Sequence, residues 1–135
     1  MAKTFRLEIL TLKRTAYAGM IISLIAPGAK SSFGVLVRHA PMISSLETGI
    51  LKIREPAGKE VSAFLGEGFL MVEKDGVVIL ASRAEIAHEI DVERAKASRD
   101  RALTRLKERS PDLDIVRAEA SLQRALARLK AVGVS

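Results

Sequence analysis

The sequence predicts a β + α fold, with an N-terminal β-sandwich over residues 1–84 and a C-terminal antiparallel two-helix hairpin over residues 85–135. In the first part, apolar residues recur at every second position and glycines separate short runs, as is typical of strands. In the second part, Ala, Arg, Leu and Glu dominate and apolar residues recur every three or four positions, as in helices. The two patterns meet at residues 90–95, Ile-Asp-Val-Glu-Arg-Ala.

Composition limits the class of protein. A chain of 135 residues is long enough for one well-packed domain with an appendage. Since 48% of the residues are hydrophobic but only 4% are aromatic, we expect an aliphatic core. The absence of cysteine excludes a disulfide framework or a thiolate metal site. We expect no membrane-spanning segment, because no run of roughly 18 apolar residues occurs, and no signal peptide at the N-terminus.

The net charge of +6 suggests nucleic acid or an acidic protein surface as a partner. The excess is spread, with 11 basic and 7 acidic residues in 1–84 and 11 and 9 in 85–135, so a solvated basic surface fits equally well. A nucleic-acid-binding module is therefore the alternative function. Against it, the chain lacks the aromatic stacking residues of single-strand binders and has no helix-turn-helix or zinc motif.

Short apolar runs predict the strands of the sandwich. In the first run, Phe5, Leu7 and Ile9 alternate with polar residues, as in a half-buried strand. Asp75-Gly76 between two apolar runs predicts a tight hairpin, since that turn requires a positive φ. Further strands are predicted in residues 16–26, 33–37, 46–54, 61–65 and 69–73, with a bend at 66–68.

Catalytic motifs are missing, and we expect a non-catalytic protein without a metal site. His39 and His88 lie far apart in the sequence, with no cluster of acidic ligands between them. Gly66-Glu67-Gly68 is followed by Met71 where a dinucleotide-binding fingerprint needs glycine, and it leads into a strand. No nucleophile-elbow pattern occurs.

Capping residues define the two helices. Asp91 is positioned to cap a first helix that runs from Val92 to about Glu108 without Gly or Pro. Ser110-Pro111-Asp112 predicts a stop and a restart, with proline at the first position of the second helix. Gly133 is a suitable terminator after about Val132.

The helices offer narrow, alanine-rich apolar seams, so their packing energy is modest and we expect a hairpin that is able to open. The seam residues are Val92, Ala95, Ala102, Leu103 and Leu106 on the first helix and Ile115, Ala118, Leu122, Ala125, Leu126 and Leu129 on the second.

An arginine stripe lies beside the seam. Arg117, Arg124 and Arg128 share one face of the second helix, and Arg94 and Arg101 share one face of the first. If the hairpin closes, several guanidinium groups can converge, and guanidinium is well suited to bidentate phosphate recognition. A solvated charged face has the same spacing, so spacing alone leaves both interpretations open.

A series of motifs resembles the epsilon subunit of the F-type ATP synthase over nearly the whole chain. The motifs are, in order, Ala26-Pro27-Gly28, residues 33–36, His39-Ala40-Pro41, residues 68–70, Asp75-Gly76, residues 90–95 and Arg117-Ala118-Glu119. Two departures fall in the β domain. Members of the family commonly have Pro-Gly where this chain has Val37-Arg38, and Ser-Gly-Gly-Phe at residues 66–69.

The resemblance implies a non-catalytic subunit in the central stalk of a proton-translocating ATP synthase, coupling the rotor to the catalytic head. Its sandwich would dock on the gamma subunit and the c-ring. Its mobile helices would extend toward the catalytic alpha and beta subunits and inhibit ATP hydrolysis. The implied location is peripheral, at the cytoplasmic face of the cell membrane.

Some bacterial members of this family bind ATP in the folded-down state, through an Ile/Leu-Asp-x-x-Arg-Ala motif and additional arginines. The resemblance therefore implies ATP as a regulatory ligand, with no cofactor required. Arginines would bind the phosphates, and the carboxylates would face base or ribose because they repel phosphate. A nucleotide sensor and a passive binder both fit the sequence. The matching residues are Glu85, Asp91, Arg94, Ala95, Arg101, Arg124 and Arg128.

Overall fold

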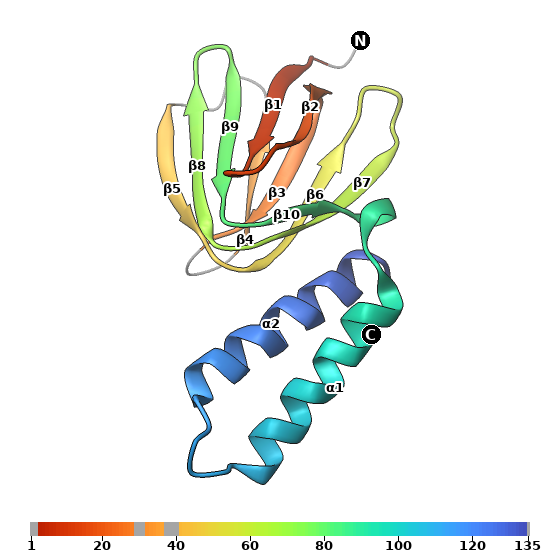
Figure 1. The fold of residues 1–135 in the computed structure, drawn as a ribbon. Helices are drawn as coiled ribbons and strands as arrows, with labels where there is room; N and C mark the ends of the chain where they lie inside the picture. The colour runs from red at the N-terminus through yellow and green to blue at the C-terminus, as the bar shows by residue number, and fades with distance from the viewer. Residues whose placement is uncertain (1–2, 29–31, 37–40, 135) are drawn as a thin grey trace.

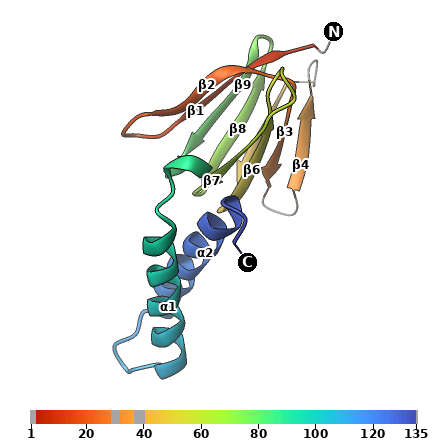
Figure 2. The ribbon, with the colours of Figure 1, turned by 90° about the vertical axis from the view of Figure 1, so that its right-hand side faces the viewer.

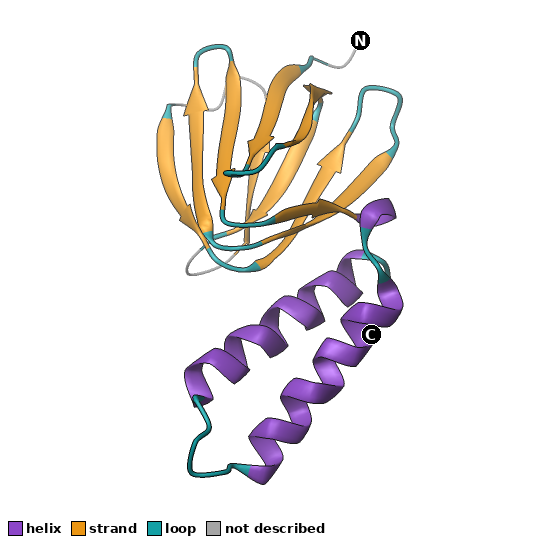
Figure 3. Ribbon diagram, viewed as in Figure 1, coloured by secondary structure: helices purple, strands orange, loops and turns teal. Residues whose placement is uncertain are grey.

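The computed structural model describes residues 3–28, 32–36 and 41–134, and it shows two β-sheets followed by a helical hairpin (Figures 1 and 3). The predicted sandwich and hairpin are thus confirmed. The helical segments are η1 (Ala87–Glu89), α1 (Val92–Glu108) and α2 (Ile115–Ala131). The strands are β1 (Phe5–Leu10), β2 (Thr15–Ile21), β3 (Ser23–Pro27), β4 (Ser32–Leu36), β5 (Met42–Leu46), β6 (Gly49–Arg54), β7 (Glu60–Leu65), β8 (Gly68–Glu73), β9 (Gly76–Ala81) and β10 (Ala84–Ile86).

The two sheets have five strands each, in the orders β2-β1-β9-β8-β5 and β10-β7-β6-β3-β4. Within the described chain, β1 and β9 are the parallel pair and the other paired strands are antiparallel. The alternation predicted for β1 is confirmed, since Phe5, Leu7 and Ile9 are buried. The sheets enclose an aliphatic core whose fully buried members include Leu7, Ile9, Ile21, Leu24, Leu51, Ile53, Leu65, Leu70 and Ile79.

One strand prediction needs correction, and two strands lie outside the predicted ones. The run predicted over residues 16–26 is two strands, because the chain leaves the first sheet after Ile21 and enters the second at Ser23. At this crossing, the Ile22 N–H donates to the Arg54 carbonyl at 2.8 Å. Strands β5 and β10 were not predicted, since β5 has two adjacent serines and β10 has only three residues. Residues 84 and 85, between which we expect the domain boundary, both belong to β10, which pairs with β7.

The predicted Asp75-Gly76 hairpin joins β8 and β9, but the glycine lies at the first position of β9. Lys74 and Asp75 form the two-residue loop. Gly76 has a φ of 149°, and a side chain there would collide with the carbonyl of Arg6 on the neighbouring strand β1. Glycine is therefore required both by the backbone conformation and by the close approach of β1.

The helix ends follow the predicted capping chemistry at two places and depart from it at one. The Asp91 carboxylate accepts a hydrogen bond from the Arg94 N–H at 3.1 Å and caps α1. Gly133, with a φ of 81°, follows the end of α2. The predicted restart at Pro111 is wrong, because Pro111 lies in a turn and Asp114 caps α2 three residues later.

The two helices meet along small side chains. Ala95 and Ala102 of α1 and Ala118, Ala125 and Leu129 of α2 are buried, as the predicted seam requires. Three further predicted seam residues are largely exposed: Leu103 (48%), Ile115 (39%) and Leu126 (42%). Alanines thus form most of the seam, which allows the helix backbones to approach closely.

The hairpin docks on the sandwich through the C-terminal half of α2. This segment packs on the outer face of the second sheet, over β6 and β7, where Phe64, Ile90, Ala127 and Ala131 form a small buried cluster. The end of the hairpin that joins α1 to α2 points away from the sandwich in both views (Figures 1 and 2). Ile90, where the sequence changes from a strand pattern to a helix pattern, therefore also contributes to the packing between the sandwich and the hairpin.

Two features of the sequence lie outside the described residues. The Val37-Arg38 departure and His39 fall in the segment 37–40, which the structure does not describe.

Across residues 3–28, 32–36 and 41–134, no helix has the length and apolar character needed to cross a membrane.

Candidate functional site

A polar cavity of about 410 Å³ lies between the sandwich, the linker and both helices. Six of the seven predicted site residues line it, namely Glu85, Asp91, Arg94, Ala95, Arg124 and Arg128. Three other residues complete its walls: Arg83, Glu89 and Ser98. The fold therefore brings together side chains that are separated by up to 45 residues (83 to 128) in the sequence.

Glu85 and Arg128 join the sandwich to α2 at one wall of the cavity. Glu85 lies on β10 directly beside Phe64 of β7, on the face that α2 covers. Nε and Nη2 of Arg128 donate to the two carboxylate oxygens of Glu85 at 2.9 and 3.1 Å. The guanidinium carbon also lies 4.3 Å from the centre of the Phe64 ring, a cation–π distance. Arg128 is thus already engaged by a carboxylate and an aromatic face.

The carboxylate of Glu89, another lining residue, forms an ion pair with Arg14 of the sandwich. Its carboxylate accepts hydrogen bonds from Nη1 and Nη2 of Arg14 at 2.8 and 3.2 Å, and from the Ile86 N–H at 3.1 Å. The bond from Arg14 is the main reason that the pKa of Glu89 is lowered from its ordinary value. Arg14 also donates to the Ala84 carbonyl at 2.9 Å. The loop between β1 and β2 therefore holds the linker η1 against the sandwich.

The start of α1 supplies the floor of the cavity. Asp91 uses one oxygen to cap the helix, and the side chain of Arg94, an exposed residue, lines the cavity from the first turn. Ala95 is only 3% exposed and packs in the hairpin, so its small side chain leaves the space above it open. A larger residue at this position would fill part of the cavity.

Three cations of the cavity lack an acidic partner among the described residues: Arg83, Arg94 and Arg124. Nη2 of Arg124 donates to the Ser121 hydroxyl at 3.2 Å. The pKa of Arg124 is lowered, first by burial and then by the nearby charges of Arg83 and Arg128. Like charges held this close form a positive region, to which an anion is attracted.

Arg101 is the predicted site residue that the structure places outside the cavity lining. Its Nη2 donates to the Ser98 hydroxyl at 3.1 Å, so it contacts a lining residue but remains exposed. Seven residues after Arg94 on α1, it lies two turns farther along the helix. The helix face was predicted correctly, but the cavity ends before it reaches this position.

The sequence contained a signal for two of the three residues that were missed. Ser98 follows Arg94 by four positions and so lies on the same helix face. Arg83 precedes Glu85 by two positions, the spacing that places side chains on one face of an extended segment. Glu89 offered no signal, because its position depends on Arg14, 75 residues earlier.

The cavity is rich in charged groups of both signs. In the described part of the chain, no group of three or more His, Cys, Asp or Glu side chains is arranged to hold a metal ion. Its arrangement suits an anion with a neutral or hydroxyl-bearing part, because unpaired guanidinium groups lie beside carboxylates that can accept hydrogen bonds.

Two family models together match residues 4–133 of this chain. The family model for the ATP synthase delta/epsilon chain β-sandwich domain matches residues 4–87, and that for its long α-helix domain matches residues 88–133. The ATP synthase epsilon chain of Pelotomaculum thermopropionicum is 47% identical over 108 residues, covering 80% of each chain. That of Desulforamulus reducens is 40% identical over 112 residues, covering 83% of this chain and 84% of the relative.

A solved structure shares the fold. A chain in the mitochondrial ATP synthase of Euglena gracilis (OSCP/F1/c-ring) superposes with a TM-score of 0.79 at 24% identity, covering 95% of this chain and 80% of that one. Sandwich, hairpin and sequence relatives all agree, and the chain belongs to the delta/epsilon family of ATP synthase subunits, as a non-catalytic subunit of the epsilon type.

Proposed function

We propose that this chain couples the rotor to the catalytic head in the central stalk of a proton-translocating ATP synthase and restrains ATP hydrolysis through its helices. In this proposal, residues 1–84 dock on the gamma subunit and the c-ring, and residues 85–135 form the regulatory part. The complex would place the chain peripherally at the cytoplasmic face of the cell membrane. Family membership supports the stalk role over the nucleic-acid-binding alternative.

The outer face of the first sheet is the proposed docking surface for gamma. Its exposed apolar side chains include Ile43 (74%), Phe69 (55%) and Leu80 (43%). Phe69 and Leu80 are direct cross-strand partners, and Ile43 lies on the neighbouring strand β5. The hairpin packs on part of the other sheet, over β6 and β7. An apolar patch of this kind on a soluble domain indicates a protein contact.

Restraint of hydrolysis requires a hairpin that can leave its docked position. The docking cluster is small, with Phe64, Ile90, Ala127 and Ala131 as its buried members. The sandwich core contains no helix residue among its described members, so the helices can move without opening that core. A stable domain that bears a weakly docked element is a suitable two-state device.

Removal of the helices tests the regulatory role. Deletion of residues 88–135 should leave assembly into the complex intact and raise its ATP hydrolysis, because the docking face lies on the sandwich. Phe69→Glu is the matched variant, since it should lower binding to gamma while the helices are retained. Unchanged hydrolysis after the deletion, measured with and without added nucleotide, would rule out the inhibitory role.

We further propose that the polar cavity binds ATP when the hairpin is folded down. The observation that supports this most strongly is the convergence of Arg83, Arg94 and Arg124, each without an acidic partner among the described residues, on one cavity. These guanidinium groups would hold the phosphates, while Glu85 and Asp91 would face the ribose or base. Arg128 is engaged by Glu85, so its proposed role is to hold the cavity wall.

ATP in this cavity would stabilise the docked hairpin, because the walls come from β10, the linker and both helices. The size of that effect depends on affinity. With free ATP at ~1,000 times its dissociation constant, the docked state gains about 4 kcal/mol, and with ATP near the dissociation constant it gains only ~0.4 kcal/mol. The same cavity thus serves as a switch only if cellular ATP greatly exceeds the dissociation constant.

Calorimetry on the isolated full-length chain tests the site. ATP binding should weaken by about 10- to 100-fold in Arg94→Ala, Arg124→Ala and Arg83→Ala, since a hydrogen bond to a charged group contributes about 1.5–3 kcal/mol. Arg105→Ala is the control, because Arg105 is exposed on α1 and does not line this cavity. Absence of binding heat at millimolar ATP would remove the nucleotide site and leave the stalk role unaffected.

A further inference from the structure

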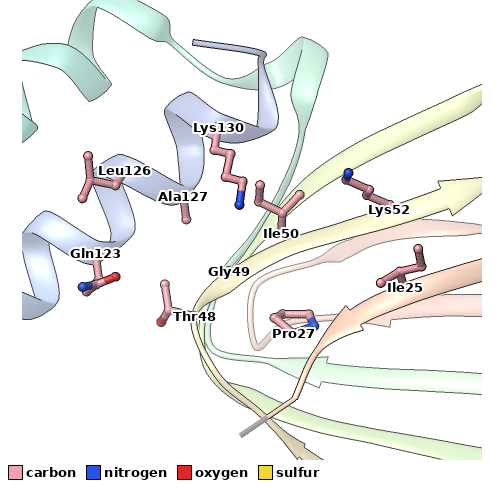
Figure 4. Close-up of a pocket in the computed structure, with 10 residues that line it drawn as sticks. All are labelled: Ile25, Pro27, Thr48, Gly49, Ile50, Lys52, Gln123, Leu126, Ala127 and Lys130. Carbon is pink, nitrogen blue, oxygen red and sulfur yellow. The ribbon is translucent and has the colours of Figure 1, made fainter. Parts of the chain in front are cut away.

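A second groove lies on the opposite flank of α2 from the polar cavity, between the helix and the second sheet (Figure 4). Its volume is about 400 Å³. The apolar part of its lining includes Ile25, Pro27, Ile50 and Leu126. None of its lining residues is acidic, and none is shared with the proposed nucleotide cavity. The groove is therefore a separate feature of the surface.

The groove exists because α2 covers only part of the sheet. Ile25 on β3 is the cross-strand partner of Lys52 on β6, and Ile50 lies two residues before Lys52 on the same face. Ile50 packs against the docking cluster under α2, whereas Ile25 remains 47% exposed. Leu126 of α2 is 42% exposed on the other side. Two apolar walls thus face a gap that the protein itself leaves unfilled.

Two lysines border this gap. Lys130 extends from α2 toward the sheet, and Lys52 extends from β6 toward the helix, with Ile50 between them (Figure 4). Neither ammonium group makes an ion pair with a residue that the structure describes. An apolar floor with two unneutralised cations at its edge is complementary to a molecule with one apolar part and one anionic group.

We propose that this groove binds a medium-chain fatty carboxylate of about eight to twelve carbons. The acyl chain would lie between Leu126 and Ile25, and the carboxylate would accept hydrogen bonds from Lys52 and Lys130. The volume falls within the range of about 300–1,000 Å³ that small-ligand pockets occupy. Since one wall is the sandwich and the other is α2, an occupied groove also stabilises the docked hairpin. This site does not depend on ATP binding.

Decanoate titrated into the full-length chain, below its micellar concentration, tests the proposal. Calorimetry should show saturable one-to-one binding, and the methyl NMR signals of Ile25, Ile50 and Leu126 should shift with the same dissociation constant. Lys52→Gln and Lys130→Gln should each weaken binding on the order of tenfold. Lys130→Arg should retain it, and Lys74→Gln, on the distant β8–β9 loop, should leave it unchanged. Circular dichroism verifies that each variant is folded.

Three outcomes would overturn the proposal. Decyltrimethylammonium has the same chain length with the opposite charge, so binding as tight as that of decanoate would show that the lysines do not select the ligand. Absence of saturable decanoate binding would exclude the site directly. If the same methyl signals instead shift with protein concentration in the absence of decanoate, a second copy of the chain covers the groove, and the proposal is wrong.

Discussion

Arg128 holds three parts of the molecule together through one guanidinium group. It belongs to α2, forms a bidentate ion pair with Glu85 of β10 and lies over the ring of Phe64 on β7. Its side chain is 23% exposed and that of Glu85 is 31% exposed, so the pair is shielded more than an ordinary surface ion pair. Bidentate geometry adds direction to the attraction. This contact favours one position of α2 on the sheet.

Arg124, one turn earlier on the same helix, differs from Arg128 in having no carboxylate partner among the described residues. Its described neighbours include Arg83 and Arg128, and its hydrogen-bond acceptor is a neutral serine hydroxyl. The positive charge there is not balanced by a carboxylate contact in the described residues. Two arginines on the same face of α2 thus have different contacts, since Arg128 is ion-paired to Glu85 and Arg124 is bonded to a serine hydroxyl.

Tyr17 provides a pH-dependent prediction at the residue scale. Its hydroxyl donates to the Glu55 carboxylate at 2.9 Å, and burial followed by this hydrogen bond raises the pKa of Tyr17 to about 12. The resulting stability is fully present below the unfolded pKa of about 10 and is lost as the pH rises through 12. Because the chain has one tyrosine, its absorbance near 295 nm reports this group alone.

We expect half-ionisation of Tyr17 near pH 12 in the folded chain and near pH 10 in denaturant. Glu55→Gln should lower the folded value without restoring the denatured one, since burial is the larger cause. A folded midpoint near 10 would contradict this account of the Tyr17 environment.

At the scale of elements, the alanine seam determines how closely α1 and α2 approach. Ala102 and Ala125 are 2% and 0% exposed, which leaves no space for a longer side chain. Ala125→Leu should therefore destabilise the closed hairpin by about 1–3 kcal/mol through overpacking. Hydrogen exchange of the α1 and α2 amides should become faster, while exchange in the sandwich strands stays the same.

Ala120→Leu is the control for this prediction, because Ala120 is exposed on the same helix. Its exchange should match that of the unmodified chain. Equal exchange rates in Ala125→Leu would show that the seam can repack around a leucine.

At the scale of the whole molecule, the sandwich and the hairpin differ in how much each can stabilise itself. The main core is formed by strand residues alone, from Phe5 to Ile86. Each helix has 17 residues, and most of their buried side chains are alanines. Isolated helices of this length are only marginally stable in water, so the stability of the hairpin depends on its packing against the sandwich.

Two fragments test this difference. Residues 1–90 should fold and unfold cooperatively, whereas residues 91–135 alone should show little helix by circular dichroism. Since Phe64 and Ile50 lose their cover in the first fragment, Phe64→Ser is a useful companion variant that restores a polar surface. A helical, cooperatively melting second fragment would mean that the seam itself supplies the stability.

The sequence by itself determined the order of the parts and their local chemistry. Alternation in β1, the Asp91 cap and the Gly133 terminator follow from contacts within a few residues, which pattern and capping rules describe. The arginine faces of both helices were likewise predicted from helical periodicity. Resemblance to a known family assembled seven candidate residues, of which six line one cavity.

Only the tertiary structure decided which of these faces meet and where the cavity ends. Several decisive contacts join residues that are far apart in the sequence. The strand division at Ile22 involves Arg54, 32 residues away. The Arg14–Glu89 and Glu85–Arg128 ion pairs span 75 and 43 residues. The exclusion of Arg101 has the same origin, because the docking of α2 on the sheet limits the cavity to the first turns of α1. Periodicity reports which face of an element is buried, but long-range packing decides what that face contacts.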